Sequence, residues 1–364
     1  MSKITAIILA AGAGKRIKPI VTSKPLISFC NRPLISWIID DLKKIKINNF
    51  IIVANPHDNF SGYQTVIQSE PNGMAAAVLL ALKIVSRGPL IIVNGDDLID
   101  PKIIAKFYQQ INRTPEKIVL TAIKSNLPGG YFAGLKIIEK PTQKPSPWLK
   151  LVLDYFPHPK PLVKVLNSVS SQQDDQYEQA LNKLSDQIVL VKAAGYFQSL
   201  KYPWDILDMM KIFLNQRHQA KIDKTAKLMP GVNVINSYIG PNVVLGHHAL
   251  VRDSIIEAGS VVGYHTEICR SYVGPNNNFH TNYVGDSIIE AGSNLGSGAR
   301  LANMRFDKKE ILPGRKKLGA VMAKGSQLGI NASVMPGVLL GSNSICGSGL
   351  VLKQNLEANE FKNS

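Results

Sequence analysis

The sequence predicts an α/β domain built on a parallel sheet, followed by a left-handed parallel β-helix of hexapeptide repeats. Two observations support this fold class. Strand-like apolar runs alternate with helical patterns over residues 3–123, and aliphatic residues recur at a spacing of six within residues 226–352. A period of six matches neither the helical repeat of 3.6 residues nor the strand repeat of two, and it is the sequence sign of a β-helix.

The hexad repeat assigns a role to each position. The most regular run has one aliphatic residue or cysteine at every sixth position, namely Leu328, Val334, Leu340, Cys346 and Leu352. We expect these side chains to point into the coil, and Gly, Asn or Pro-Gly pairs between them to form the corners. A β-sandwich, the alternative, would show period-two alternation and more variable spacing.

The N-terminal region alternates between strands and helices. Strands are expected at residues 4–11, 50–54, 90–93 and 117–123, and helices at residues 33–45, 74–85 and 102–111. Such alternation implies a parallel sheet with right-handed crossovers, whose ligands bind at the carboxyl ends of the strands. A helix over residues 205–214 leads toward the coil, and the boundary is expected near residues 221–227.

Composition is that of a soluble globular protein with room for two domains, at 364 residues, 45% apolar and 19% charged. No signal peptide or membrane-spanning pattern is evident. The cysteines (Cys30, Cys269 and Cys346) are an odd, widely spaced set, which argues against a disulfide framework or a zinc cluster. A reducing cytoplasm is the simplest compartment.

A net charge of +16 favours an anionic partner. The basic residues are scattered, and the nearest cluster, within residues 308–317, lies inside the repeat region. No RNA- or DNA-binding signature accompanies them, and phosphorylated metabolites explain the charge at least as well. We therefore expect neither a nucleic acid nor a membrane as partner.

The first predicted strand runs into a loop that suits a polyphosphate. Gly12 and Gly14 would let backbone N–H groups approach phosphates closely, and Arg16 and Lys24 would supply positive charge. The spacing is not that of a Walker loop, and a bare Gly-x-Gly more often marks only a tight turn.

Further motifs, in chain order, resemble those of the sugar-1-phosphate nucleotidyltransferases. They are residues 9–16 with Lys24, Gln68 with Gly73, Gly95-Asp96, and Glu139-Lys140-Pro141. With the hexad coil behind them, the whole chain resembles the two-domain N-acetylglucosamine-1-phosphate uridylyltransferase/glucosamine-1-phosphate acetyltransferase family. The resemblance implies a Rossmann-like nucleotidyltransferase domain at residues 1–222, a hexapeptide-repeat acetyltransferase domain at residues 223–364, and a homotrimer.

The resemblance also implies roles in the head. Gly12 and Gly14 would line the triphosphate, Arg16 and Lys24 would neutralise it, Gln68 and Gly73 would face the base, Glu139 would contact substrate, and Asp96 would hold Mg²⁺. A sugar phosphate would attack the α-phosphorus of a nucleoside triphosphate and release pyrophosphate. Such a reaction depends on positioning and charge neutralisation rather than on a protein nucleophile.

Three departures leave open a head that keeps the fold without the reaction. Met74 stands where the family has threonine, and Gln198 lies in the segment that usually carries a second metal-binding Asp or Asn. Residues 148–151 replace an Asn-Ala-Gly sugar-binding turn.

In the coil, residues 280–287 resemble the H-[LF]-x-Y-[LVI]-G-D segment of the acetyltransferase half. Acetyl transfer from a thioester needs a neutral amine, so a histidine can take its proton as it attacks, while donors hold the oxyanion. By resemblance His280 is the base, Asn303 contacts acetyl-CoA or the amine, and Arg252, Tyr283 and Lys309 hold the sugar phosphate. A family lysine about twelve residues before His280 is missing, and Arg270 is its candidate replacement. By contrast, His247 and His248 are expected to be ordinary surface residues.

Three functions follow. The preferred one is a cytoplasmic sugar-nucleotide enzyme that acetylates an amino-sugar 1-phosphate in its coil and transfers a nucleotide in its head. The second is a nucleotidyltransferase whose coil only oligomerises. The third is a non-catalytic nucleotide-binding or scaffold subunit, which the missing metal ligand favours and the His280 segment disfavours.

Overall fold

The structure is a computed structural model that describes residues 3–171 and 175–363. The chain divides into two compact units. The head unit holds residues 1–13 and 35–197, and the coil unit holds residues 14–34 and 198–364. The boundary expected between residues 222 and 223, which separates a nucleotidyltransferase domain from an acetyltransferase domain, stays a prediction.

The head unit is built on a mixed sheet with strand order β10-β6-β9-β4-β1-β2-β3. Its strands are β1 (Thr5–Ala10), β2 (Asn49–Ala54), β3 (Gln64–Ile67), β4 (Leu90–Asn94), β6 (Ile118–Lys124), β7 (Tyr131–Ala133), β8 (Lys136–Ile138), β9 (Trp148–Phe156) and β10 (Ile188–Ala193). The strands on this path pair in parallel except β9, which runs antiparallel to β4 and β6. The four strands expected from the sequence, which correspond to β1, β2, β4 and β6, therefore all run in the same direction. The antiparallel β9 was not predicted, and it occupies the segment interpreted as a replaced turn.

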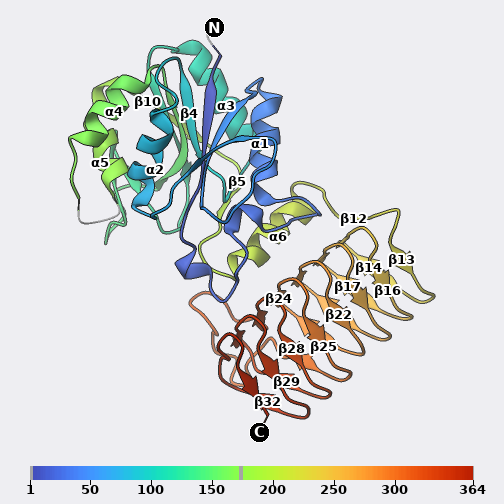
Figure 1. Ribbon diagram of the computed structural model, residues 1–364. Coiled ribbons are helices and arrows are strands. Elements are labelled where there is room, and N and C mark those ends of the chain that lie inside the picture. The colour runs from blue at the N-terminus through green and yellow to red at the C-terminus, as the bar shows by residue number, and fades with distance from the viewer. Residues whose placement is uncertain (1–2, 172–174, 364) are drawn as a thin grey trace. The chain divides into compact units, whose positions relative to one another are not determined.

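Helices cover both faces of this sheet (Figure 1). They are α1 (Leu34–Lys44), α2 (Gly73–Leu82), α3 (Pro101–Arg113), α4 (Pro159–Asn167) and α5 (Gln176–Asn182). The helices α2, α4 and α5 pack with β1, β2 and β4 into one core cluster. The sequence determines where α3 begins, because the Asp100 carboxylate caps the Lys102 N–H and Pro101 begins the first turn.

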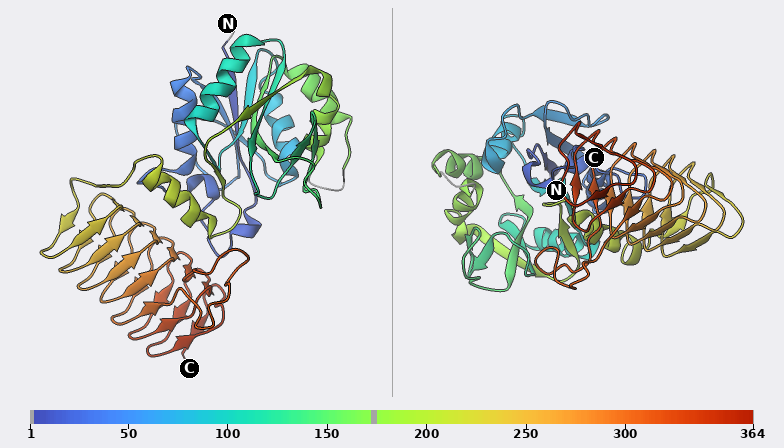
Figure 2. Two further views of the ribbon diagram at one scale, coloured as in Figure 1. Left: turned by 180° about the vertical axis from the view of Figure 1, so that it is seen from behind. Right: turned by 90° about the horizontal axis from the view of Figure 1, so that it is seen from below.

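The coil unit contains three stacked parallel sheets, consistent with the left-handed β-helix expected from the hexads (Figure 2). Sheet I is β12 (Lys221–Ile222), β15 (Tyr238–Ile239), β18 (Ile255–Ile256), β21 (Tyr272–Val273), β24 (Ile288–Ile289), β27 (Val321–Met322) and β30 (Leu339–Leu340). Sheet II is β13 (Lys227–Leu228), β16 (Val244–Leu245), β19 (Val261–Val262), β22 (Asn278–Phe279), β25 (Asn294–Leu295), β28 (Gln327–Leu328), β31 (Ile345–Cys346) and β33 (Phe361–Lys362). Sheet III is β14 (Asn233–Ile235), β17 (Leu250–Arg252), β20 (Glu267–Cys269), β23 (Tyr283–Gly285), β26 (Arg300–Leu301), β29 (Ser333–Val334) and β32 (Val351–Leu352).

The hexad residues are buried and form a continuous core along the coil. A ladder of serines supports the corner from sheet III to sheet I. In it, each hydroxyl accepts from the N–H of the next coil and donates to a carbonyl two residues back, at Ser237, Ser254, Ser271 and Ser287. This ladder satisfies buried corner groups that the short strands leave unpaired.

The remaining elements are short. They are η1 (Lys15–Ile17), η2 (Lys24–Leu26), β5 (Asp97–Ile99), η3 (Ser185–Gln187), β11 (Phe197–Ser199) and α6 (Asp205–Asn215). An insertion at residues 302–320 separates β26 from β27. Among the described residues, we find no helix with the length and apolarity that crossing a membrane requires.

Candidate functional sites

Four predicted residues of the head unit lie beyond strand ends or at a helix start. Gly12 follows β1, Gln68 follows β3, Gly73 begins α2, and Asp96 follows β4. The Gly95 N–H donates to the Leu9 carbonyl at 2.8 Å, which holds the turn that carries Asp96 beside the end of β1. The buried Gln68 side chain donates to the Gly73 carbonyl at 3.4 Å. The four residues therefore occupy the edge where parallel strands present ligands.

The carboxylates of Asp96 and its neighbour suit a magnesium ion that enters the site bound to the phosphates of a substrate. Asp97 is buried and accepts from the Asn94 amide at 3.0 Å. No group of three or more His, Cys, Asp or Glu side chains able to hold a metal occurs in the part of the chain that the structure describes. Mg²⁺ needs no such cage, because one or two carboxylates, substrate phosphates and water complete its octahedron.

Segment 14–34, in the coil unit, carries the two predicted phosphate-binding cations. Gly14 has φ of 61° and caps η1, which places Arg16 on a tight turn. The exposed Arg16 guanidinium lies 5.9 Å from the centroid of the Tyr202 ring. Lys24 begins η2 and is half-buried. Both cations are thus on short turns rather than on strands of the sheet.

Glu139 follows β8 in the head, near a buried group of ionisable side chains that the sequence did not reveal. The Lys150 ammonium lies 2.8 Å from the Asp154 carboxylate, and the Tyr177 hydroxyl donates to the same carboxylate at 2.9 Å. Burial raises the pKa of Glu178 to about 7, which Lys150 opposes and Glu139 reinforces. These residues lie on β9 and α5, two elements that no sequence pattern had assigned.

Glu178 predicts a pH dependence of head stability. Its folded pKa, about 7, lies above the ordinary value of 4.5, so the folded protein binds the proton more tightly than the unfolded chain. Stability from this group is complete below pH 4.5 and is lost as pH rises to about 7. We expect Glu178→Gln to match the wild type at pH 5 and to exceed it at pH 7.5 by up to about 3 kcal/mol in unfolding free energy. Denaturant titrations at both pH values measure this, and parallel pH profiles would contradict it.

His280 interrupts a column of glycines in the coil. The residue that follows each sheet II strand is glycine at most corners, at Gly246, Gly263, Gly296, Gly329 and Gly347. A Cβ atom at Gly263 would lie 2.2 Å from the His280 carbonyl oxygen, and one at Gly329 would lie 2.5 Å from the Ser348 nitrogen. Close stacking therefore favours glycine here, and a histidine at this position departs from what the fold requires.

The corner of His280 is also one residue shorter than its neighbours. Five residues separate Val262 from Ile268, but only four separate Phe279 from Val284, although both pairs are in register. The buried Asn282 braces this corner, because its carboxamide oxygen accepts from the His280 N–H at 2.7 Å and its nitrogen donates to two carbonyls of the next coil. The exposed His280 side chain borders a surface groove of about 390 Å³. That groove extends over Gly296 and Gly329 to Ser348.

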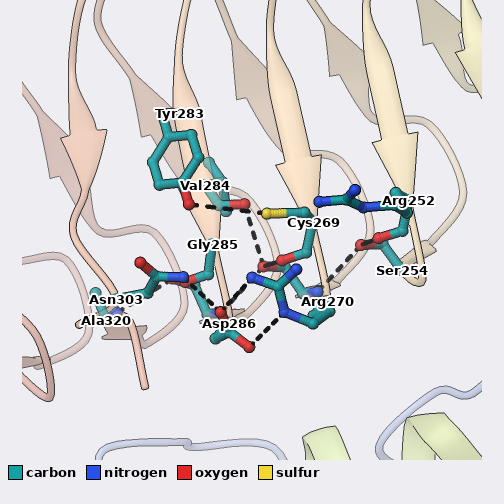
Figure 3. Close-up of polar contacts among 12 residues, drawn as sticks. Arg252, Ser254, Cys269, Arg270, Tyr283, Val284, Gly285, Asp286, Asn303 and Ala320 are labelled. Atoms are coloured by element: carbon teal, nitrogen blue, oxygen red, sulfur yellow. Dashed lines mark hydrogen bonds and ion pairs between the residues drawn. The ribbon is translucent and has the colours of Figure 1, made fainter. Parts of the chain in front are cut away.

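A polar cluster lies at the other edge of sheet III (Figure 3). Asp286 accepts two hydrogen bonds from the Arg270 guanidinium, at 2.9 and 2.8 Å, and one from the Asn303 amide at 2.5 Å. A Cβ atom at Gly285 would lie 2.8 Å from the Tyr283 hydroxyl and 2.7 Å from the Asn303 amide, so this glycine lets the two side chains converge. Burial raises the pKa of Tyr283 to about 12, which keeps it a neutral donor.

The other predicted residues of the coil lie in different parts of it. Arg252 lies in register with Cys269 and Gly285 on the same sheet. Arg270 is paired with Asp286, so it is a member of the cluster and not a lone replacement for the missing lysine. Lys309 lies on the exposed insertion, where its N–H donates to the Asp307 carboxylate. His280 is at the corner from sheet II to sheet III, and Asn303 is beyond the opposite end of sheet III.

Asp286 provides a matched test of this cluster. Asp286 and Asp253 occupy equivalent left-handed corner positions, with φ of 47° and 49°. Alanine strains the left-handed backbone equally at both positions. Only Asp286→Ala also leaves the Arg270 guanidinium without its carboxylate partner. We expect Asp286→Ala to lower the unfolding free energy by about 1–2 kcal/mol more than Asp253→Ala, since the pair is only partly buried. Chemical denaturation measures the difference, and equal losses would show that the cluster adds no stability.

Comparisons with known proteins agree with this architecture. The family model described as the MobA-like NTP transferase domain matches residues 6–224. The chain is 27% identical to the bifunctional protein GlmU of Methanococcus maripaludis, over 98% of this chain and 96% of that one. It is 26% identical to the bifunctional sugar-1-phosphate nucleotidylyltransferase/acetyltransferase of Sulfurisphaera tokodaii, over 98% of this chain and 99% of that one.

One solved structure supports the fold of the N-terminal part. A putative glucose-1-phosphate thymidylyltransferase from Bacillus anthracis superposes with a TM-score of 0.50 at 17% identity. The match covers 56% of this chain and 93% of that structure, and at this identity it bears on fold alone. Since the family model spans more than half of the sequence, the chain belongs to the family of the MobA-like NTP transferase domain.

Proposed function

We propose that the protein is a bifunctional enzyme of sugar-nucleotide biosynthesis. Its coil transfers the acetyl group of acetyl-CoA to the amine of an amino-sugar 1-phosphate, and its head transfers a nucleotide from a nucleoside triphosphate to a sugar 1-phosphate. The observation that carries the proposal is His280, an exposed imidazole in a corner column otherwise rich in glycine, directly above a groove. A coil with only a structural role would not need a histidine at this corner.

In the coil, the acceptor amine attacks the thioester carbonyl and loses a proton, which His280 takes as general base. The thiolate of coenzyme A then leaves as the tetrahedral intermediate collapses. The groove from Gly296 to Ser348 suits the thin, extended arm of acetyl-CoA, because its lining includes the small residues Gly296, Ser297, Gly329 and Ser348. Tyr283 and Asn303 offer neutral donors, and Arg252 and Lys309 offer positive charge to the sugar phosphate.

In the head, the sugar phosphate oxygen attacks the α-phosphorus and pyrophosphate leaves on the opposite side. The Gly12 and Gly14 backbone approaches the triphosphate, while Arg16 and Lys24 neutralise it. Gln68 and Gly73 face the base, and Glu139 orients the sugar. Asp96 would hold Mg²⁺, which when bound neutralises charge that builds up on the phosphates.

The assembly that fits this chemistry is a homotrimer, with active sites completed by neighbouring coils. Its support is the set of large apolar side chains exposed on the coil, among them Val261, Tyr264, Ile330 and Val351. Cyclic assembly would bury such faces. The buried free thiols Cys30, Cys269 and Cys346 fit a reducing cytoplasm. Light scattering should give three times the chain mass, and a monomer at micromolar concentration would contradict the shared site.

A scaffold subunit is the second candidate. Gln198 favours it, because its carboxamide stands where a second carboxylate ligand is expected and donates to the Ser199 carbonyl at 3.1 Å. A nucleotidyltransferase with a merely oligomerising coil is the third. The deciding assay follows thiol release from acetyl-CoA by the purified full-length chain with a panel of amino-sugar 1-phosphates. Release that depends on the amine supports our proposal, and its absence with every amine leaves only the other two.

A further inference from the structure

Two glutamates of the β-helix bind the backbone of segment 14–34. Glu257 and Glu290 occupy the first position of the corner from sheet I to sheet II, on coils separated by one other coil. The two residues are only 1% and 6% exposed. Four other corners have small residues at this position, at Gly240, Gly274, Ala323 and Gly341, and two have acidic residues that are not buried, Asp223 and Glu357. Burial of a carboxylate is unfavourable without donors, so these two side chains call for an explanation.

Glu290 binds the segment at residues 21 and 22. Its Oε1 atom accepts from the Thr22 N–H at 2.7 Å and from the Thr22 hydroxyl at 2.5 Å. Its Oε2 atom accepts from the Val21 N–H at 3.2 Å and from the Lys324 N–H at 3.0 Å. Because Lys324 belongs to the next coil, the carboxylate is itself fixed to the β-helix before it binds the segment.

Glu257 binds the segment at a strained turn formed by residues 30 and 31. Cys30 and Asn31 have φ of 56° and 61°, a left-handed pair without glycine. Such a backbone persists only when its surroundings hold it. The Glu257 carboxylate accepts from the Asn31 N–H at 2.7 Å, and the Tyr272 hydroxyl of the intervening coil donates to the Ser28 carbonyl at 2.8 Å.

Apolar packing and hydrogen bonds hold the segment together. Phe29 stacks on Phe213 with centroids 4.9 Å apart, and a cavity of about 110 Å³ remains beside the segment. Its lining includes Ile20, Leu26 and Glu290. Apolar contact is not directional, so the hydrogen bonds to the carboxylates add the constraint on where the backbone of residues 21–31 lies.

We infer that Glu257 and Glu290 are positioning residues for nucleotidyl transfer. By holding residues 21–31, they fix the part of the segment that carries Lys24, one of the two cations assigned to the triphosphate. The inference rests on the proposed nucleotidyl transfer. It also explains why segment 14–34 belongs to the coil unit although it directly follows β1.

Glu290→Gln and Glu257→Ala in the full-length protein test this inference. At Glu290 both oxygens accept from backbone N–H groups, so glutamine keeps the shape but turns one acceptor into an NH₂ group that faces an N–H group. Alanine removes the Glu257 oxygen that accepts from the Asn31 N–H. Glu357→Gln is the matched control, because Glu357 has the same corner position and is exposed. We expect amide hydrogen exchange in residues 20–31 to become at least about tenfold faster, and kcat/KM for nucleotidyl transfer to fall about 10- to 100-fold, as expected when reacting groups shift by up to about 1 Å.

Acetyl transfer by the same variants should stay at the wild-type rate, which a general loss of folding would not allow. Unchanged exchange in residues 20–31 would overturn the hydrogen-bonded attachment. Faster exchange with wild-type nucleotidyl transfer would overturn the positioning role. A wild type that forms no nucleotide sugar would defeat the proposed function itself, and hydrogen exchange would then decide the attachment alone.

Discussion

His280→Ala should lower acetyl transfer about 10²- to 10⁴-fold, the range lost when a general base is removed. The amine must give up a proton as it attacks, and no carbon side chain can accept it. The affinity for acetyl-CoA should change little, because the imidazole meets the amine and not the nucleotide end of the cofactor. Steady-state thiol release and equilibrium binding of acetyl-CoA measure the two effects separately.

The matched control for this variant is His247→Ala. His247 is an exposed histidine at the same kind of corner, where glycine and not histidine follows the sheet II strand. It should retain wild-type turnover. A His280→Ala variant that keeps the wild-type rate would show that another group takes the proton.

Asp96→Asn should reduce nucleotidyl transfer about 10²- to 10³-fold, which corresponds to the several kcal/mol that a metal ion contributes to transition-state stabilisation. The carboxamide keeps the shape of the turn after β4 but removes the negative charge that would hold Mg²⁺. Initial rates of pyrophosphate release, measured across a range of Mg²⁺ concentrations, should show both a lower maximum and a weaker apparent affinity for the metal.

Two comparisons make the Asp96 result specific. Acetyl transfer by Asp96→Asn should remain at the wild-type rate, because Asp96 and His280 belong to different compact units. Asp40→Asn, on helix α1, removes a carboxylate of the head from outside the strand ends and should leave both reactions intact. Nucleotidyl transfer that survives in Asp96→Asn would place the metal on other residues.

The hexads predicted the β-helix well because one inward side chain per strand must fill the coil axis, and this produces a period that no other element shares. The comparisons with known proteins confirm the α/β head as a fold class. Sequence reasoning missed β9, α4 and α5, since their apolar residues support several pairings and only the assembled sheet selects one. The antiparallel direction of β9 is a property of that sheet and not of its own residues.

In the candidate sites too, local features were readable from the sequence and long-range contacts were not. The Phe279-to-Val284 interval is one residue shorter than the Val262-to-Ile268 interval, so the unusual corner of His280 was readable as a break in the hexad spacing. By contrast, the contacts of Glu290 with Thr22 and of Glu257 with Asn31 join residues 268 and 226 positions apart. No local pattern encodes such pairs, because each partner looks like an ordinary turn residue. Arg270 was singled out from sequence, but only the structure shows its pairing with Asp286.

Both proposed activities can be followed in a single reaction that contains the purified wild type, acetyl-CoA, an amino-sugar 1-phosphate, a nucleoside triphosphate and Mg²⁺, with mass spectrometry over time. We expect an N-acetylated sugar phosphate and then a nucleotide sugar, with the first product lost in His280→Ala and the second in Asp96→Asn. If no sugar is acetylated and no nucleotide sugar forms with any amine or nucleotide, the chain is not the bifunctional enzyme that we propose.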